Sequence, residues 1–489
     1  MYHIEFGLPQ SFYADEPEIS EPAINYTYEI RNIISNNDYY KLIPISFVYG
    51  TLPVYIMTLS LMVFSKSLNL LNIAFDKTTI FIFLRIITVL ISTGIILATV
   101  ALTKKHFENT KTVLLALFLI ALNWKFIVLS HYANADIVLA LMLLLSFYTF
   151  WLYDKNPTNK NLFLAGIFFG LAVGTKVTAL ISLPIFLYLI WKKKDFYGLP
   201  GFIFSALIAF MVSNPFSIIF IKEFGYRIFG MLSKEGGLVF DSVDSNPFKY
   251  LLALTQMVTP MILAVSAYGA YRKIKHSQDK NFDVFLITNV ALYLIFFSLQ
   301  SRRVDRWLLP ILPIVFMYAA FGTEHVFEIL KKPAYKIALI ILVFGIYLIN
   351  PILLLTQFQR WTPKSEAYLW AQTNLPETAT KLVYTEEGLD PMNKLGFAKV
   401  IKFQVYASDG AQLFYPENPL AYEYIFLSSR PMENFKRPEV VKAYPYYAYR
   451  WEIFEKTVRD PKYFEVVKDF TLTKPNLIPL SDVVIYRRI

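Results

Sequence analysis

Four carboxylates lie within seven positions near the start of the chain: Asp15, Glu16, Glu18 and Glu21. They precede the first long apolar run. A carboxylate held in place can act as a general base and take a proton from an attacking hydroxyl group. An isolated acidic cluster is more often a solvated loop. The interpretation of this cluster therefore depends on which other charged residues the fold brings to it.

The composition indicates a membrane protein and excludes several kinds of site. Of the 489 residues, 55% are hydrophobic and 17% aromatic, and the mean hydropathy of +0.43 is too high for a soluble protein of this length. The net charge is +10, and the basic residues cluster at the ends of apolar runs, which favours a membrane topology over nucleic-acid binding. Without cysteines the chain has no disulfides or thiolate metal sites. No HExxH, GxGxxG or Walker motif supports a zinc hydrolase or a nucleotide site.

Apolar stretches that could cross a membrane as helices, roughly 17–25 residues each, recur through the first 356 positions. They lie at about 43–64, 78–103, 112–129, 137–153, 162–190, 198–220, 249–271, 282–299, 304–322 and 336–356. We expect a mainly α fold, a polytopic transmembrane helical bundle over residues 43–356. An external acidic segment at residues 1–42 precedes it, and no cleavable signal peptide is visible there.

The composition changes at about residue 357. The sequence RWTPKSEAYLWAQTNLP predicts a helix with Thr362 as its N-cap and Pro363 at its first position. Four short apolar runs follow, separated by Pro, Asn, Asp and Gly: KLVYT, YIFLSS, YFEVV and DVVIY. Residues 357–489 are therefore predicted to form a small soluble α/β domain.

Basic residues cluster in five loops, and the positive-inside rule assigns all five to the cytoplasm. The loops carry Lys104–Lys105, Lys155 and Lys160, Lys192–Lys194, Arg272–Lys275, and Lys331–Lys332. The segment 162–190 must then cross twice, as two short helices that meet at an outer tip near Lys176. Three loops and the C-terminal domain fall on the outer side; these loops are 130–136, 221–248 and 300–303.

The segment 43–64 decides where the acidic cluster lies. If it spans the membrane, Asp15 and Glu16 lie in the cytoplasm, opposite Asp136. If it lies in the membrane surface, all three carboxylates share the outer side. Hydropathy favours a span, whereas helix-interrupting residues in its first half favour an interfacial or re-entrant element. These residues are Pro44, Gly50 and Pro53.

Five stretches in order resemble the polyprenyl-phosphate-sugar-dependent glycosyltransferases of the C superfamily, especially the protein O-mannosyltransferases and the aminoarabinose transferases. The stretches are GLPQSFYADEP, FVYGTLPVYI, LSHYANADIVLALMLLLSFY, GIFFGLAVGTKVTALISLP and RWLLPILPIVFMYAA. They cover about residues 7–322. The resemblance implies a multi-pass enzyme of the plasma membrane. It would move a sugar from a polyprenyl-phosphate donor to a protein, lipid or glycan acceptor on the outer face, and it would invert the anomeric configuration.

The resemblance also implies where the site lies. In the family an Asp–Glu pair occupies the first external loop, ahead of an interfacial helix. Asp15 and Glu16 match the pair, and 43–64 would be the interfacial element. The family has a transmembrane helix before the pair, whereas only fourteen residues precede Asp15 here. This departure indicates a misplaced start or a shortened chain.

Asp15 is the predicted general base for the acceptor hydroxyl, with a solvated acid as the alternative. Glu16 is predicted to support Asp15 or to contact the acceptor, with a surface acid as the alternative. Asp136 matches an acidic residue in the wall of the family's active site, although an N-cap for the helix at 137–153 is an equal alternative. Three further residues are candidates for this wall: His131, Asn134 and Tyr49.

Cations are needed to hold the departing phosphate. Lys176 lies in an apolar stretch, where ionisable residues are costly and usually functional, and snorkelling to the interface is the alternative. The planar fork of arginine suits phosphate, and QSRRVDRWLLP places Arg302, Arg303 and Arg306 on the outer side. Arg306 matches the family's arginine before the LLP run, and Asp305 could pair with one of the three. Two further cations are weaker candidates: Arg85 and Lys125.

The sequence assigns no cofactor and no metal ligand, and it leaves a divalent metal open because the wider superfamily includes members with and without one. The expected partners are a polyprenyl-phosphate-linked sugar, its acceptor and the lipid bilayer, with no nucleic acid.

The external loop FGYRIFGMLSKEGGLVFDS could close over the donor or simply connect two spans. Two other classes stay open: a transporter or flippase of lipid-linked substrates, which needs charges near the midplane, and a membrane scaffold whose C-terminal domain binds partners.

Overall fold

The chain forms two compact units. The computed structural model describes residues 3–8, 15–43, 49–70, 76–233, 246–277, 280–300, 303–358, 362–375, 382–384, 418–429, 435–443, 445–472, 477–478 and 480–489. The first unit holds the described residues of Asp15–Gly236 and Asp244–Leu353, and the second holds those of Tyr2–Ala14 and Leu354–Ile489.

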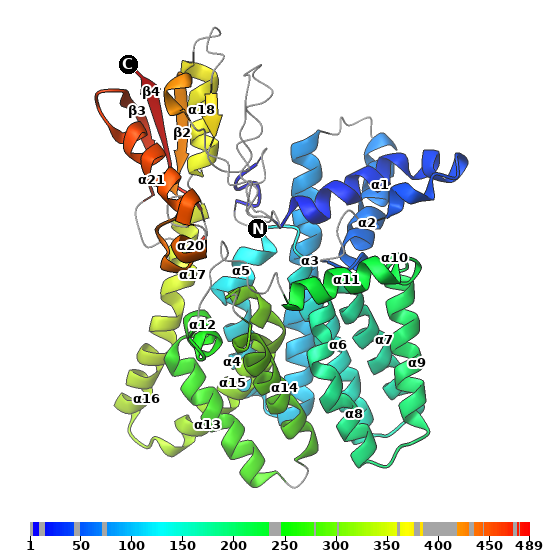
Figure 1. Cartoon of the computed structure of the whole chain (residues 1–489). Helices are drawn as coiled ribbons and strands as arrows, with labels where there is room; N and C mark the ends of the chain where they lie inside the picture. Colours follow the sequence, from blue (N-terminus) through cyan, green and yellow to red (C-terminus); the bar gives the residue numbers. More distant parts are fainter. Residues whose placement is uncertain are drawn as a thin grey trace. The chain divides into compact units, whose positions relative to one another are not determined.

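The first unit is a helical bundle (Figure 1). Its first half contains α1 (Pro17–Ser35), η1 (Tyr39–Leu42), α2 (Leu52–Leu70), α3 (Lys77–Phe107), α4 (Thr110–Ala121), α5 (Trp124–Ser130), α6 (Ala135–Lys155), α7 (Asn159–Thr175), η2 (Val177–Ser182), α8 (Leu183–Lys192) and α9 (Gly198–Ser213). Its second half contains α10 (Phe216–Ile219), α11 (Ile221–Ser233), α12 (Lys249–Val258), α13 (Pro260–His276), α14 (Asn281–Ser298), η4 (Asp305–Ile311), α15 (Leu312–Ile329), α16 (Pro333–Ile340), the π-helical turn η5 (Ile341–Gly345) and α17 (Ile346–Phe358), whose last residues belong to the second unit.

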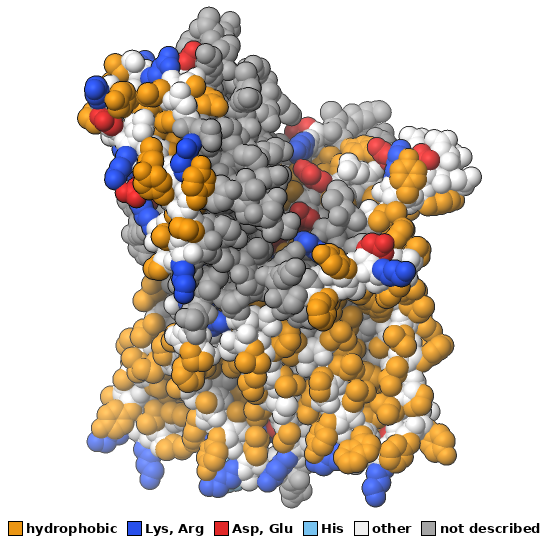
Figure 2. All heavy atoms as spheres, in the orientation of Figure 1, with side chains coloured by type: hydrophobic (Ala, Val, Ile, Leu, Met, Phe, Trp, Pro, Cys, Tyr) orange, Lys and Arg blue, Asp and Glu red, His pale blue; other side chains and the backbone are white. Residues whose placement is uncertain are grey.

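Among the described residues, five helical segments are long and apolar enough to cross a membrane, or up to seven if each of two bent pairs counts as one span. The bent pairs are α4–α5, at 53°, and α12–α13, at 102°. Three shorter apolar segments lie at Leu52–Lys66, Val177–Lys192 and Gly198–Ser213. Figure 2 shows hydrophobic side chains over this bundle and Lys and Arg side chains along its lower edge. The predicted polytopic membrane bundle is confirmed.

Helices α7 and α9 pack closely because α7 carries a glycine at every fourth position. A Cβ atom added at Gly170 would lie 2.1 Å from the carbonyl oxygen of Ala206, and one at Gly166 would lie 2.0 Å from Ser205 Oγ. Small residues at this spacing let two membrane helices approach until their backbones touch. The close approach holds the C-terminal end of α7, and therefore Lys176, against the rest of the bundle.

The chain breaks at Lys176, as predicted, because this residue has extended backbone angles between α7 and η2. That both halves cross the membrane stays a prediction. Residues 17–35 differ from the expected acidic loop segment, since they form helix α1. Its apolar side packs on α2 through residues such as Ile19 and Ala23. Its low hydropathy hid this helix from a search for spans.

The segment 43–64 contains the start of α2 at Leu52, and residues 44–48 lie outside the described residues. Pro53 therefore falls in the first helical turn, where its missing N–H has no intrahelical partner to lose. Of the external loop 221–248, residues Ile221–Ser233 form α11. Helices α1, α2, α10 and α11 lie at the same end of the bundle, and α11 runs across the helix ends (Figure 1).

The second unit is a small α/β domain, as predicted. Its elements after α17 are α18 (Pro363–Asn374), β1 (Leu382–Tyr384), η7 (Pro419–Ala421), β2 (Tyr424–Ser428), α20 (Pro438–Ala443), α21 (Pro445–Arg459), β3 (Phe464–Phe470) and β4 (Val483–Arg488). The strand order is β1-β2-β4-β3; β1 and β2 are parallel and the other pairs antiparallel. Thr362 caps α18 by accepting a hydrogen bond from the Ser365 N–H at 3.0 Å, as predicted.

The close approach of α7 and α9 predicts that Gly170→Ala destabilises the bundle. The added methyl group must push the two backbones apart, at a cost of about 1–3 kcal/mol. The matched control is Gly201→Ala on α9, where a Cβ atom would meet no atom within 4 Å. The midpoint of thermal unfolding in detergent should fall for Gly170→Ala and change little for Gly201→Ala. Equal midpoints would contradict this account of the contact.

Candidate active site

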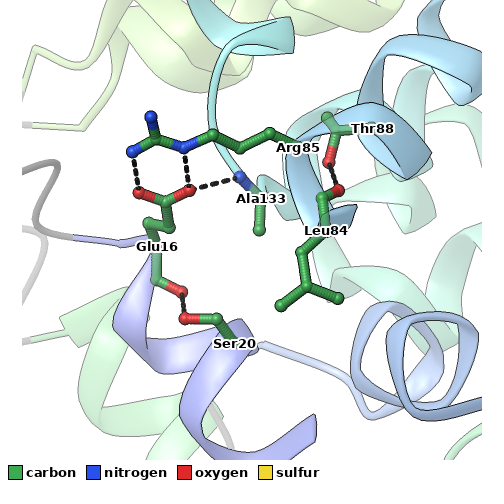
Figure 3. A network of polar contacts seen from close by, with 6 residues as sticks. All are labelled: Glu16, Ser20, Leu84, Arg85, Thr88 and Ala133. Atoms are coloured by element: carbon green, nitrogen blue, oxygen red, sulfur yellow. Dashed lines mark hydrogen bonds and ion pairs between the residues drawn. The ribbon is translucent and has the colours of Figure 1, made fainter. Parts of the chain in front are cut away.

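A buried ion pair lies at the start of α1. Arg85 of α3 donates from Nε to Glu16 Oε1 at 2.9 Å and from Nη2 to Oε2 at 2.8 Å, so the pair is bidentate. The backbone N–H of Ala133 also donates to Glu16 Oε1, at 3.1 Å (Figure 3). Both side chains of the pair are fully buried. The pair therefore ties α1, α3 and the connector between α5 and α6 together.

Glu16 is held by its backbone as well as by its side chain. Its carbonyl oxygen accepts a hydrogen bond from the Ser20 hydroxyl at 2.7 Å (Figure 3). The Arg85 guanidinium also lies over the Tyr132 ring, 5.1 Å from its centroid. With its carboxylate occupied and buried, Glu16 is placed to position Asp15, the neighbouring residue. This geometry favours the first of the two roles predicted for it.

Asp15 belongs to a second set of charges, together with Arg306, Asp136 and Lys176. Arg306 Nη2 lies 2.6 Å from Asp15 Oδ2, and its Nε lies 3.1 Å from Asp136 Oδ2. Lys176 Nζ donates to Asp136 Oδ1 at 2.8 Å. Two carboxylates and two cations thus form one continuous chain of ion pairs, which we call the four-charge cluster. Four residues predicted from widely separated parts of the sequence meet in it.

Burial differs across the four-charge cluster. The side chains of Asp136 and Lys176 are 2% and 6% exposed, whereas those of Asp15 and Arg306 are 21% and 22% exposed. The buried end is therefore anchored within the bundle. The open end, with Asp15 and Arg306, is the part that solvent can reach.

Aromatic rings surround the Lys176 ammonium. Its Nζ lies 5.4 Å from the centroid of Tyr49 and 5.7 Å from that of Trp307, which are distances of cation–π contacts. Tyr49 reaches this position because the next residue, Gly50, lies against the end of α7. Its N–H donates to the Thr175 carbonyl at 2.9 Å, and a Cβ atom there would lie 1.8 Å from a backbone oxygen. Glycine is required at this position.

The N-cap role considered for Asp136 belongs to Asn134. The Asn134 side chain accepts a hydrogen bond from the Asp136 N–H at 2.7 Å, so Asp136 lies in the first turn of α6 and its carboxylate is left for the cations. That alternative for Asp136 was wrong. His131 Nδ1 lies 2.7 Å from the Ile127 carbonyl oxygen. Asn134 and His131 thus shape the connector that leads into α6 and Asp136.

The remaining arginines are distributed differently. Arg303 donates to Asp305 at 3.1 Å and also contacts the Gln256 side chain, so Asp305 does pair with one of the predicted arginines. Arg302 lies outside the described residues. Arg85 binds Glu16, so the role considered for it in holding phosphate is not favoured by this geometry.

Sequence reasoning missed the partnership of Glu16 with Arg85 and the place of Trp307 beside Lys176. A signal for the first was present, because an arginine inside an apolar run needs a buried counter-charge, and Glu16 is a carboxylate adjacent to a predicted site residue. No signal identified Trp307, since its ring reaches Lys176 only through the fold.

Comparisons with known proteins bear on the whole chain. Residues 49–226 match the model of the family described as dolichyl-phosphate-mannose-protein mannosyltransferase. The fold is similar to that of ArnT from Cupriavidus metallidurans bound to undecaprenyl phosphate (TM-score 0.56, 9% identity) and in the apo state (TM-score 0.55, 10% identity). Each of these matches covers 99% of this chain and 95% of that chain. No curated protein matches the chain.

The predicted resemblance to the C-superfamily glycosyltransferases is confirmed. The identity to ArnT is so low that the structural likeness shows only the fold. The family match rests on the sequence, and it covers mainly the first half of the bundle. The matched range includes Asp136 and Lys176, whereas Asp15 and Arg306 lie outside it. The protein is a multi-pass membrane protein. Within the described part of the chain, no group of three or more His, Asp or Glu side chains could hold a metal ion.

The buried pair predicts a large loss of stability for Glu16→Gln. The substitution leaves the Arg85 charge buried without a counter-ion, which typically costs about 3–5 kcal/mol. Replacing both residues, as in Glu16→Leu with Arg85→Met, should restore much of the loss. Thermal unfolding of the detergent-solubilised protein measures both effects.

The matched control is Glu29→Gln, also on α1. Glu29 pairs with Lys41 at 3.5 Å, and both side chains are at least 40% exposed, so its loss should cost less than about 1 kcal/mol. If Glu16→Gln lowers the unfolding midpoint no more than Glu29→Gln does, the pair does not hold the site together.

Proposed function

We propose that this protein is a glycosyltransferase that moves a sugar from a polyprenyl-phosphate donor to a hydroxyl group of a protein, lipid or glycan acceptor. The four-charge cluster is the observation that carries the proposal, because it combines a reachable carboxylate with two cations. The family match and the ArnT-like fold support sugar transfer from a lipid-linked phosphate. One of the two ArnT structures has undecaprenyl phosphate bound, which supports a polyprenyl phosphate as the carrier.

The reaction can be written on the residues of the cluster. Asp15 takes the proton of the acceptor hydroxyl, and the hydroxyl oxygen attacks the anomeric carbon of the sugar. The bond from that carbon to the phosphate oxygen breaks, the electron pair leaves with polyprenyl phosphate, and the anomeric configuration inverts. Arg306 binds the phosphate oxygens and stabilises the charge that develops on them, and the buried Lys176 adds a second positive charge behind it. Asp136 holds both cations in place.

The pairing of Arg306 with Asp15 has a consequence for the order of events. In the four-charge cluster the two positive and two negative charges balance, so a donor phosphate must compete with a carboxylate for Arg306. When Arg306 turns to the phosphate, its contact with Asp15 weakens and the carboxylate becomes free to accept a proton. Donor binding therefore prepares the base, and the donor should bind before the acceptor reacts.

The orientation in the membrane belongs to the same proposal. The Lys and Arg side chains along the lower edge of the bundle (Figure 2) support a cytoplasmic location for that edge. The end that carries α1, α2 and α11 then faces outward at the plasma membrane. The C-terminal domain is proposed to lie on the outer side as well, where it would be available to acceptors.

The role of Asp15 as general base predicts that Asp15→Asn lowers turnover by about 10²–10⁴-fold, the usual contribution of a positioned base. The purified protein would be given polyprenyl-phosphate sugars, and the release of free polyprenyl phosphate would be measured. The exposed carboxylate Glu21 supplies the matched control, Glu21→Gln, which should keep turnover.

Unchanged turnover in Asp15→Asn would contradict the assignment and direct attention to Asp136. Movement of a lipid-linked sugar across the membrane by the wild type, without release of polyprenyl phosphate from any donor, would favour the transporter instead.

Phosphate binding by Arg306 predicts that Arg306→Lys raises the donor KM about 10–100-fold. The substitution keeps the charge and removes the fork, and a hydrogen bond to a charged group is worth about 1.5–3 kcal/mol. The matched comparison is Arg303→Lys, which tests the remaining arginine candidate and should have a smaller effect. A larger rise in KM for Arg303→Lys would place the phosphate beside Arg303 rather than Arg306.

A further inference from the structure

Helix α11 has an apolar side and a charged side. Ile221, Gly225, Ile228 and Phe229 share one side, since residues four and seven positions apart lie on the same face of a helix. Ile221 and Phe229 are 60% and 72% exposed, so most of this apolar side is open. Glu223 lies on the opposite, charged side, and Lys222 lies beside Phe229 at the border between the two sides; both residues are exposed.

The apolar side of α11 continues a surface that already faces lipid. One side of α9 packs on α7, and its opposite side exposes large apolar residues that include Phe204, Leu207 and Met211. The chain turns after Asn214, and α10 exposes Ile219 before α11 begins. Exposed apolar side chains therefore run without a break from the outer side of α9 over α10 to α11. Figure 2 shows hydrophobic side chains over these elements with charged side chains beside them.

The turn from α9 into α11 is held firmly. The Thr51 hydroxyl donates to the Ser213 carbonyl at 2.6 Å and lies 3.3 Å from Asn214 Oδ1. The Phe224 ring lies 6.2 Å from that of Phe210 on α9. These contacts fix the direction of α11 across the ends of the bundle helices (Figure 1). The helix thus lies as a two-sided element at the edge of the apolar surface.

We propose that α10 and α11 form a binding surface for the lipid–water interface, with the apolar side of α11 buried at the acyl–headgroup boundary and Lys222 among the headgroups. An amphipathic helix that continues an apolar surface matches the chemistry of this boundary, where apolar and charged groups meet within one helix diameter. A surface for a protein partner would not need to be continuous with the lipid-facing side of α9. The continuity therefore favours lipid as the occupant. The sequence predicted an interfacial element at 43–64, and this surface is a separate one.

The position of α11 bears on the acidic start of α1. Burial raises the pKa of Glu18, and the neighbouring Asp15 and Glu21 raise it further, whereas the positive charge of Arg227 lowers it. Arg227 on α11 therefore acts on a carboxylate three residues from Asp15.

The test uses the absence of cysteine from the chain, which lets single cysteines be labelled without other changes. Nitroxide labels would be placed at Ile221→Cys and Phe229→Cys, with Glu223→Cys as the matched control on the opposite side of the same helix. Leu207→Cys on α9 supplies the lipid reference. In liposomes, the ratio of the collision rate with oxygen to that with a water-soluble nickel complex should be high at positions 221, 229 and 207 and low at position 223.

Two outcomes would overturn the proposal. Equal access of the nickel complex to positions 221, 229 and 223 would place α11 in water. Low access of both reagents to 221 and 229 would show that protein covers this side. The measurement reads depth in the bilayer and not turnover, so its result is independent of whether the protein transfers a sugar. Elution of each variant as the wild-type species in gel filtration confirms folding.

Discussion

The ion pair of Glu16 with Arg85 is the interaction on which the candidate site depends. Two charges without water are stable only when each satisfies the other, and a fully buried carboxylate without its guanidinium would cost several kcal/mol. The pair therefore forces α1, α3 and the connector before α6 to meet at one point. Because Asp15 and Glu16 are adjacent, the same constraint brings Asp15 to Arg306. A residue with a structural role thereby positions the residue that we propose as the base.

The four-charge cluster shows how one set of residues can be both stable and responsive. Its buried end, Asp136 with Lys176, is shielded and bound by aromatic rings, so it keeps its geometry. Its open end, Asp15 with Arg306, is partly exposed to solvent, and a phosphate can compete for the guanidinium there. Charge balance within the cluster means that any anion that enters must displace a carboxylate. Under the proposed function this displacement is what frees the base.

The membrane imposes a second constraint, which acts on the elements that carry the cluster. Helices in lipid gain little from apolar burial against one another, so close contact depends on small residues. The glycines of α7 supply that contact with α9, and Gly50 brings Tyr49 to the end of α7. The same α9 continues into α11, the element that we propose to rest in the interface. Glycines that carry no charge thus hold in place the elements that bear Lys176 and Tyr49.

Much of this protein could be predicted from the sequence alone. Apolar runs and basic loops determined a polytopic bundle, because the length of a span and the placement of positive charge are local properties of the chain. Capping and β-forming runs likewise determined α18 and the four strands. The candidate cations and carboxylates were found through residue type and resemblance, and Asp15, Asp136, Lys176 and Arg306 do meet.

Only the tertiary structure decided which positive charge pairs with which negative charge. Pairing depends on distances between segments up to about 290 positions apart, and no local pattern encodes these distances. For that reason the sequence could name Arg85 and Glu16 but could not show that they bind each other.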